Sequence, residues 1–416
     1  MEFLPEMREA QRRWAFLSVC ERLDWLPRFR HLVCCQRSQW VSELAELRLV
    51  DKFEALVSEV LPLLDGARWL EQCAARTLAP RKSSMRFTPG WMMGHRLEVQ
   101  RRPWGVVMIL APANYPLFLA GIQSLQALVA GNAVVLKPAV GREAPAVRLQ
   151  RALEQSGLPK GLMQVVPSRL SVVPELLEAG VDFAVLTGSE QTGQSVLPRC
   201  AQKLVPTVAE LSGRDLVVLA PDGDLPVALT AVSWGQTLNR GQTCMAPQRF
   251  WLPEGRLSEL PQLAMEVRGY QHPEELRGWL ESEAWGLGVS LFAGEEWTRT
   301  ILPWCRSGFV TVNDIIAPTA DPSAPFGGRG RSGYGVTRGA EGLLSLTYPQ
   351  SIFHNRGPRF HLMPPSGREH AFMDAYAAVR HGRGLERVRA SGKLAWAWIR
   401  LVLRQAMDGR KKKHSL

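Results

Sequence analysis

Residues 104–138 decide the fold and read WGVVMILAPANYPLFLAGIQSLQALVAGNAVVLKP. Two short apolar runs, WGVVMIL and AVVLKP, lie on either side of a proline-containing turn and a longer apolar segment. The uncharged part, residues 106–122, contains Pro112, Asn114 and Pro116 and is shorter than the ~20 residues that a membrane-spanning helix needs. We therefore predict a buried strand, a turn and a helix here.

The same alternation continues along the chain on both sides of this stretch. Residues 1 to about 80 show helical spacing of apolar residues. After residue 138, apolar runs such as LMQVVP, DFAVLTG, LVPTVAEL and DLVVLAP alternate with helical segments such as APAVRLQRALEQSG, and a second alternation runs from Ala231 to about Val312. Strands that alternate with helices predict an α/β fold with parallel sheets covered by helices.

Composition limits the class of protein. The chain has 416 residues, 46% hydrophobic and 21% charged, which excludes a disordered chain and suggests two or three domains at roughly 100–200 residues each. Its seven cysteines are odd in number, and no pair has the CxxC spacing of a zinc or redox site, so we predict no metal site. We also predict an intracellular, cytoplasmic location, because no export signal is visible.

The net charge of +11 is concentrated at the C-terminal end. Residues 356–416 hold fourteen Lys or Arg and four Asp or Glu, a net charge of +10, which leaves +1 for the other 355 residues. Residues 385–407 predict one amphipathic helix, interrupted by Gly392, with a basic stripe within about 60° formed by Arg389, Lys393, Arg400 and Arg404. A basic stripe beside Trp and Leu suits the surface of an anionic membrane. The alternative is a helix that packs on the body or on a second subunit. We expect no nucleic-acid partner.

Two motifs suit a phosphate or a ribose. The segment LTGSEQTG places Gly188, Ser189 and Gly193 where an apolar strand meets a helix, and free backbone N–H groups at such a point can bind a phosphate. Lys137 ends the strand VVLKP and could reach a ribose hydroxyl or phosphate above a parallel sheet. Without further context, an ordinary Gly-Ser turn explains the first motif and a solvated lysine explains the second.

Three further residues have the chemistry of a covalent catalyst. Cys244, in RGQTCMAP, has an approach through Gly241 that suits a nucleophile, for which the surroundings must lower the pKa of the thiol. Glu210, in VAELSGR, could activate water, and Asn114 could donate its amide N–H to an oxyanion. Taken singly, each has an ordinary alternative: a packed thiol, a surface carboxylate and a turn residue.

Together, the ordered motifs resemble the aldehyde dehydrogenase superfamily. They are APANYP, GNAVVLKPA, LTGSEQTG, AELSGR, GQTCMAP, SGFVTVND and APFGGRGRSGYG, and they extend over roughly residues 10–355. NYPL and the CMAP after GQT are most similar to the branch that includes fatty-aldehyde dehydrogenases. The resemblance implies a variant Rossmann cofactor domain, an α/β catalytic domain and a small bridging hairpin arm. The corresponding ranges are residues 1–82 with 103–211, residues 212–340, and residues 83–102 with 341–355, followed by a basic tail over 356–416.

The resemblance also implies residue roles and a reaction. Cys244 would attack an aldehyde, Asn114 would hold the oxyanion, and Glu210 would activate the water that releases a carboxylic acid. Lys137 would contact the adenosine ribose of NAD or NADP, and the cofactor-binding glycine motif would lie near the pyrophosphate. Phe326 and the glycines of APFGGRGRSGYG would close the catalytic domain, and the alternative interpretation of this segment is a plain Gly-rich turn. A homodimer is also expected.

Two departures from the family pattern keep other functions open. The glutamate motif that usually follows the nucleophile is absent, and only 41 positions separate Cys244 from Trp285, so the catalytic domain is expected to be shortened. Val140 stands where a glutamate often binds the ribose, which weakens a preference for NAD, and nearby Arg142 could meet a 2′-phosphate. The alternatives are a non-catalytic scaffold protein and an acyl-thioester reductase, against which the presence of Glu210 argues.

Overall fold

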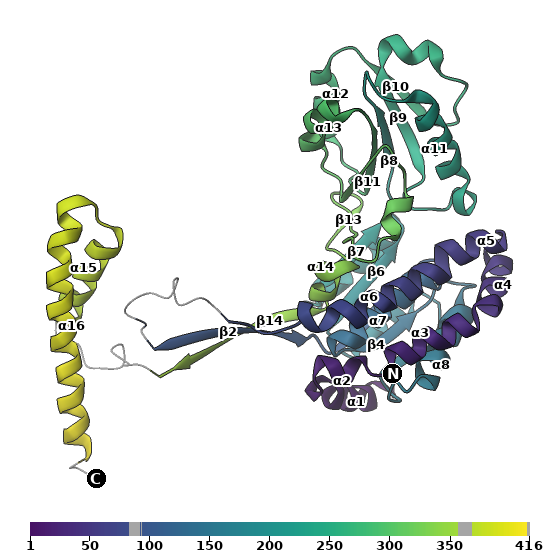
Figure 1. Cartoon of the computed structure of the whole chain (residues 1–416). Coiled ribbons are helices and arrows are strands. Elements are labelled where there is room, and N and C mark those ends of the chain that lie inside the picture. The colour runs from purple at the N-terminus through teal and green to yellow at the C-terminus, as the bar shows by residue number, and fades with distance from the viewer. Residues whose placement is uncertain (83–91, 93, 357–367, 414–416) are drawn as a thin grey trace. The chain divides into compact units, whose positions relative to one another are not determined.

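The computed structural model describes residues 1–82, 92, 94–356 and 368–413, with the backbone alone for 368 and 401–413 (Figure 1). The chain divides into two compact units. The first comprises Met1–Ala79 and Arg101–Tyr348, and the second comprises Pro80–Gln100 and Pro349–Leu416.

A six-stranded sheet forms the centre of the first part of the large unit. Its strand order is β13-β7-β6-β3-β4-β5, parallel throughout except for β13, which pairs antiparallel with β7. The strands are β3 (Val106–Leu110), β4 (Ala133–Lys137), β5 (Met163–Val165), β6 (Phe183–Gly188), β7 (Thr207–Leu211) and β13 (Gly333–Tyr334). Every residue of β3 and β4 is buried, as expected for strands that are covered on both faces. The predicted α/β fold is thus confirmed.

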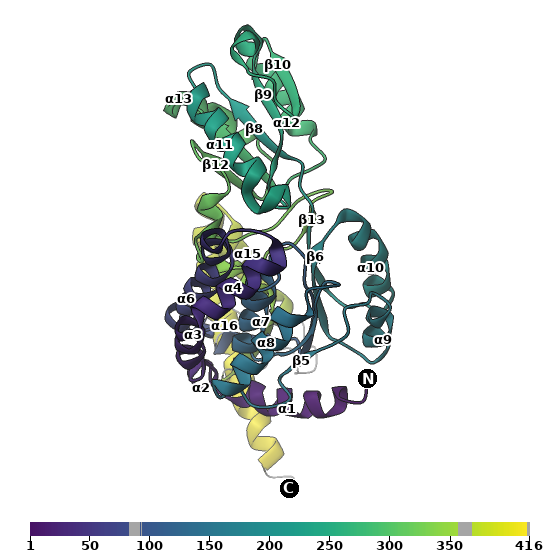
Figure 2. The ribbon, with the colours of Figure 1, turned by 90° about the vertical axis from the view of Figure 1, so that its right-hand side faces the viewer.

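Helices cover both faces of this sheet. Figure 2 shows α9 and α10 on one face and α6, α7 and α8 on the other. The helices are α1 (Leu4–Phe16), α2 (Val19–Leu23), α3 (Leu26–Cys35), α4 (Arg37–Arg48), α5 (Lys52–Ala55), α6 (Leu61–Thr77), α7 (Phe118–Ala130), α8 (Glu143–Gln155), α9 (Val172–Glu178) and α10 (Glu190–Gln202). One π-helical turn, η1 (Leu56–Val60), joins α5 to α6.

A second, five-stranded sheet follows and is parallel in every pair, in the order β10-β9-β8-β11-β12. Its elements are β8 (Asp215–Leu219), α11 (Leu225–Thr237), β9 (Pro247–Pro253), β10 (Glu266–Tyr270), α12 (Pro273–Ser282), β11 (Gly288–Phe292), α13 (Glu295–Ile301) and β12 (Phe309–Val312). The crossover from β9 to β10 contains only a 3₁₀ turn, η5 (Glu254–Glu259), whereas α12 forms the next crossover. This connection belongs to the stretch between Cys244 and Trp285, which we expected to be short.

The second unit contains a small sheet and a helical hairpin. The sheet has the order β1-β2-β14, formed by β1 (Arg81–Lys82), β2 (His95–Pro103) and β14 (Thr347–Asn355). Residues 341–345, which we predicted to begin the arm, lie instead in α14 (Gly339–Ser345). Residues 83–91 and 93 of the predicted arm lie outside the described residues.

The C-terminal segment holds two helices where the sequence predicted one. These are α15 (Arg368–His381) and α16 (Gly384–Lys413), and α16 continues through Gly392 without a break. Phe372 of α15 packs against Leu394, Ala397 and Trp398 of α16. Among the described residues, no helix has the length and apolar character needed to cross a membrane.

Candidate functional site

A cavity of about 800 Å³ lies in the large unit, where loops from the two parallel sheets meet. The carboxyl ends of parallel strands gather their loops at one edge, which is the usual position of a ligand site in such folds. Of the eight residues predicted for the site, seven line this cavity: Asn114, Lys137, Gly188, Ser189, Glu210, Cys244 and Phe326. Gly193 is the one that does not.

Cys244 lies between a kinked turn and strand β9. The turn, η4 (Leu238–Gly241), places Asn239 and Arg240 in the left-handed backbone region, and this brings the following residues to the cavity. Burial, together with the negative charges of Asp215 and Glu210, raises the pKa of the Cys244 thiol to about 12. We expected surroundings that lower this pKa. In the conformation seen here the thiol is therefore protonated, and it needs a base before it can act as a nucleophile.

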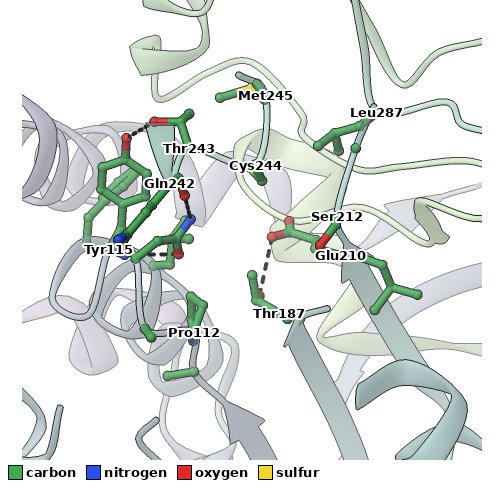
Figure 3. A pocket seen from close by; sticks show the side chains of 18 of the residues that line it. Pro112, Tyr115, Thr187, Glu210, Ser212, Gln242, Thr243, Cys244, Met245 and Leu287 are labelled. Atoms are coloured by element: carbon green, nitrogen blue, oxygen red, sulfur yellow. Dashed lines mark hydrogen bonds between the residues drawn. The ribbon is translucent and has the colours of Figure 1, made fainter. Parts of the chain in front are cut away.

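Glu210 supplies a carboxylate next to this thiol, as Figure 3 shows. It lies near the end of β7, is 3% exposed, and accepts hydrogen bonds from the hydroxyls of Thr187, at 3.4 Å, and Thr337. Burial raises the pKa of Glu210 above its usual value, against the opposing effect of these hydrogen bonds. A carboxyl group with a raised pKa is a better proton acceptor near neutral pH than an ordinary glutamate.

Asn114 comes from the loop between β3 and α7. Its Nδ2 donates to the backbone oxygen of Gln242 at 3.0 Å, and its Oδ1 accepts from the backbone N–H of Tyr115 at 3.0 Å. The Tyr115 hydroxyl and Thr243 Oγ1 are 2.6 Å apart (Figure 3). These bonds hold the Asn114 loop beside the loop that carries Cys244. An amide nitrogen has two hydrogens, so one donor of Asn114 is left after the bond to Gln242.

A buried ionic cluster anchors both loops, and our sequence reasoning missed it. Arg48 donates to Asn239 Oδ1 at 3.1 Å and to Glu54 at 3.2 Å, and its guanidinium lies over the ring of Tyr115. The Nδ2 of Asn239 donates to the backbone oxygen of Asn114 at 3.0 Å. Arg48 and Asn239 are 191 positions apart, so no local pattern in the sequence points to this contact.

Glu59 adds a second acid to this cluster. It is fully buried in the π-helical turn η1, and its Oε2 accepts from the backbone N–H groups of Leu117 and Phe118 at the start of α7. Its Oε1 lies 3.7 Å from Arg48. Burial raises the pKa of Glu59 to about 7, although Arg48 and the two N–H groups oppose the shift.

The other part of the cavity has features that fit a dinucleotide. Lys137 is 6% exposed, lines the cavity, and has no hydrogen-bond acceptor among the described residues. Burial lowers its pKa. Ser189 caps helix α10 by accepting from the backbone N–H of Thr192 at 3.1 Å, so the positive end of this helix lies beside the cavity. A cation without a partner and a helix N-terminus are suited to ribose hydroxyls and phosphates.

Two other residues at this end differ from what their motifs suggested. A side chain on Gly193 would meet Leu211 of β7 at 2.8 Å, so this glycine allows α10 to pack closely on the sheet. Arg142, which we considered for a 2′-phosphate, donates to the backbone oxygens of Ala113 and Gly141. Val140 is 75% exposed at the edge of the cavity and offers no polar group there.

Phe326 and Arg338 form part of the wall near the reactive residues. Phe326 is 5% exposed and stacks on Phe309, with 5.6 Å between the ring centroids. The guanidinium of Arg338 lies 4.5 Å from the centroid of the Phe326 ring. Arg338 belongs to the segment GVTRGAEG, which the sequence analysis did not single out. Its closeness to the cavity becomes visible only in the fold.

The chain is similar to known proteins in sequence and in fold. Residues 2–266 match the family model described as "Aldehyde dehydrogenase family". A 4,4'-diapolycopene aldehyde oxidase from Methylomonas sp. is 28% identical, over 85% of this chain and 81% of that protein. A putative succinate-semialdehyde dehydrogenase [NADP(+)] from Mycolicibacterium smegmatis is 33% identical, over 59% of this chain and 46% of that protein. The substrate-bound structure of Staphylococcus aureus AldH superposes with a TM-score of 0.80, at 18% identity, over 90% of this chain and 98% of that one.

Proposed function

Because the chain belongs to the aldehyde dehydrogenase family and is therefore an NAD(P)-dependent oxidoreductase acting on aldehydes, we propose that Cys244, Glu210 and Asn114 carry its chemistry. The observation that supports this most strongly is that all three side chains line one cavity, with Glu210 beside the thiol. The product would be a carboxylate, formed through a thioester on Cys244.

The first step is the attack of Cys244. The thiol proton leaves to solvent, and the sulfur forms a bond to the aldehyde carbon. The carbonyl oxygen becomes an oxyanion that accepts hydrogen bonds from the remaining Nδ2 donor of Asn114 and from the backbone N–H of Cys244. A bound NAD or NADP would supply the acceptor for the hydride of this adduct, which would leave a thioester on Cys244.

The second step is hydrolysis. Glu210 takes a proton from water, the resulting hydroxide attacks the thioester carbon, and the bond to sulfur breaks to give the carboxylic acid and the thiolate. The hydrogen bonds from Thr187 and Thr337 keep the Glu210 carboxylate aimed at the cavity while it takes the proton from water. This role for Glu210 distinguishes the proposal from an acyl-thioester reductase, which must not hydrolyse its thioester.

Lys137, Gly188 and Ser189 would hold the cofactor at the other end of the cavity. Lys137 would donate to the adenosine ribose, and the start of α10 would face the pyrophosphate. Val140 accepts no hydrogen bond from a ribose hydroxyl. We therefore expect weak discrimination between NAD and NADP, which calorimetric titration of each cofactor would measure.

Cys244→Ala tests the assignment of the nucleophile. We expect this variant to fold normally and to lose aldehyde oxidation by orders of magnitude, when reduced nicotinamide is followed by absorbance across aliphatic and aromatic aldehydes. Cys305→Ala is the matched control, because Cys305 is also partly buried but does not line the cavity. A dead Cys305→Ala enzyme beside an active Cys244→Ala enzyme would overturn the assignment.

Glu210→Gln separates the two steps. We expect one rapid equivalent of reduced cofactor followed by slow turnover, because the thioester would form but would not be hydrolysed. An unchanged steady rate would remove Glu210 from the mechanism.

Cofactor binding by the wild-type protein tests the alternative function. A wild-type protein that binds neither NAD nor NADP would favour the non-catalytic scaffold.

We further propose that the C-terminal helical hairpin contacts anionic membrane surfaces from the cytoplasm. One face of α16 packs on α15, but an exposed apolar stripe remains, formed by Leu385, Val388, Trp396 and Ile399. The exposed basic residues Arg389, Lys393 and Arg400 lie next to this stripe on the helix. An exposed apolar stripe beside a basic one matches an interfacial helix.

Vesicle sedimentation tests this contact with the full chain. Val388→Ser/Ile399→Ser should weaken binding to vesicles rich in anionic lipid, and added salt should weaken it in the wild type. Equal binding by wild type and variant would exclude the apolar stripe as the membrane-contact surface.

We also propose that the protein is a homodimer, because the arm resembles the oligomerisation arm of the family. Light scattering that reports a monomer would exclude this proposal.

A further inference from the structure

Arg338 is a buried cation on the wall of the cavity. It precedes α14, is 6% exposed, and lines the same cavity as Cys244 and Glu210. Its charge acts on both of these groups: it lowers the pKa of the Cys244 thiol and the pKa of Glu210. Arg338 is therefore close enough to the reactive residues to influence a substrate that is bound to them.

The guanidinium of Arg338 is only partly satisfied. Nη1 donates to the backbone oxygen of Thr319, and the rings of Phe326 and Phe118 lie 4.5 and 5.7 Å from the guanidinium carbon. Nε is buried and has no acceptor, and Nη2 also has no acceptor among the described residues. No carboxylate in the described part of the chain lies within ion-pair distance of this side chain.

A buried guanidinium without an ion-pair partner is energetically costly, and Glu210 acts on Arg338 only from beyond ion-pair distance, so the desolvation of Arg338 is offset only in part. Arg22 is also buried without an acid, so burial alone does not indicate a ligand. Arg338 differs from Arg22 because it borders a cavity that a ligand can enter. A planar guanidinium binds a carboxylate or a phosphate through two parallel hydrogen bonds.

The position of Arg338 indicates the substrate, rather than the phosphate groups of the cofactor, as the source of the anion. The groups suited to the dinucleotide are Lys137 and the start of α10, at the ends of β4 and β6. Arg338 instead contacts Phe326 and Phe118 and interacts electrostatically with Cys244.

We propose that Arg338 binds a carboxylate on the aldehyde substrate, so that the preferred substrates are oxo acids with an aldehyde at one end and a carboxylate at the other. This inference rests on the proposed function of Cys244. The aromatic walls beside Arg338 would pack on the methylene chain between the two groups, while the guanidinium would fix its far end.

Substrate pairs of equal chain length provide the test in the wild-type enzyme. Butanal is compared with 4-oxobutanoate, and pentanal with 5-oxopentanoate. We expect the KM for the oxo acid of each pair to be at least roughly tenfold lower than that for the neutral aldehyde. A difference of this size is what one charge-assisted hydrogen bond contributes. Equal or higher KM values for the oxo acids would overturn the proposal while leaving aldehyde oxidation intact. Failure to oxidise either class would count against the proposed function itself.

Variants assign the preference to the residue. Arg338→Met should raise the ratio of KM for oxo acid to KM for neutral aldehyde by roughly 10- to 100-fold. Arg338→Lys should retain part of the preference for oxo acids, because lysine keeps the positive charge. Arg331→Met is the control, since Arg331 lies only seven positions before Arg338 but is paired with Glu190 outside the cavity. An unchanged ratio in Arg338→Met would overturn the proposal.

A binding measurement remains informative if Arg338→Met turns over slowly. Succinate and glutarate should slow the alkylation of Cys244 by iodoacetamide in the wild type, and should do so much less in Arg338→Met. Butanol is the neutral control. Absence of protection by either dicarboxylate in the wild type would count against an anion site at Arg338, whatever the catalytic activity.

Discussion

Arg48 and Arg338 are both buried close to the residues that we assign to catalysis, but their surroundings differ. Arg48 reaches Asn239, Ser58, Glu54 and Glu59, and its guanidinium also covers the ring of Tyr115. Arg338 has one backbone oxygen and two aromatic rings. One guanidinium is surrounded by acceptors from its own chain, and the other faces a cavity in which no carboxylate of the described residues, Glu210 included, lies within ion-pair distance of it.

This difference indicates two different roles. A saturated guanidinium fixes the elements that supply its acceptors, and here these elements are the turns next to Cys244 and Asn114. Arg338 gains most from an incoming anion, because Glu210 lies beyond ion-pair distance and offsets the desolvation of the guanidinium only in part. Arg48 is therefore a positioning residue, whereas we propose that Arg338 contacts the substrate.

The largest expected effect is on stability. Arg48→Met would leave Glu54 and Glu59 without their cation, and breaking a buried ion pair in this way costs about 3–5 kcal/mol of the free energy of unfolding. Arg338→Met breaks no ion pair and should cost less than about 1 kcal/mol. Urea denaturation of both variants measures the contrast. Equal losses of stability would show that the two arginines have the same structural role.

Glu59 gives a pH-dependent test of the same cluster. Its pKa of about 7 in the folded state exceeds the value of 4.5 for a free glutamate, so the folded protein binds the proton more tightly. Its contribution to stability is therefore complete below about pH 4.5 and is lost as the pH rises to about 7. The loss amounts to about 3 kcal/mol, from 1.36 kcal/mol per pKa unit.

Glu59→Gln should remove this part of the pH dependence. An amide oxygen can still accept from the N–H groups of Leu117 and Phe118, but it does not titrate. We expect the variant to gain stability relative to the wild type as the pH rises from 5 to 8. Urea denaturation at several pH values gives the difference, and parallel curves would mean that Glu59 does not titrate in this range.

The sequence predicted those features that depend on short stretches of chain. The apolar runs that we assigned to strands lie in β3 to β8, because strands buried on both faces need continuous apolar residues. Cys244, Glu210 and Asn114 could be nominated because each lies in a short motif. Their roles stay predictions until the variants are measured.

The features that escaped prediction depend on contacts across the fold. Thr337, which orients Glu210, is 127 positions from it. Gly193 was expected to approach a phosphate, but its position is explained by the side chain of Leu211, which no local pattern indicates. The raised pKa of Cys244 could not be predicted either, because burial and the charge of Asp215 produce it only after folding.

The smallest expected effect concerns the acidity of the Cys244 thiol. The positive charge of Arg338 lowers the pKa of this thiol, and the negative charge of Asp215 raises it. Arg338→Met should therefore shift the alkylation of Cys244 by iodoacetamide to higher pH, and Asp215→Asn should shift it to lower pH, each by less than about one unit. Arg48→Met serves as the comparison, because Arg48 is not among the groups that act on this thiol. Mass spectrometry of the peptide that contains Cys244 separates its reaction from that of the exposed Cys20, Cys34 and Cys35. A shift in Arg48→Met as large as that in Arg338→Met would mean that both arginines act on the thiol through the position of the loop, and the distinction between the two would no longer hold.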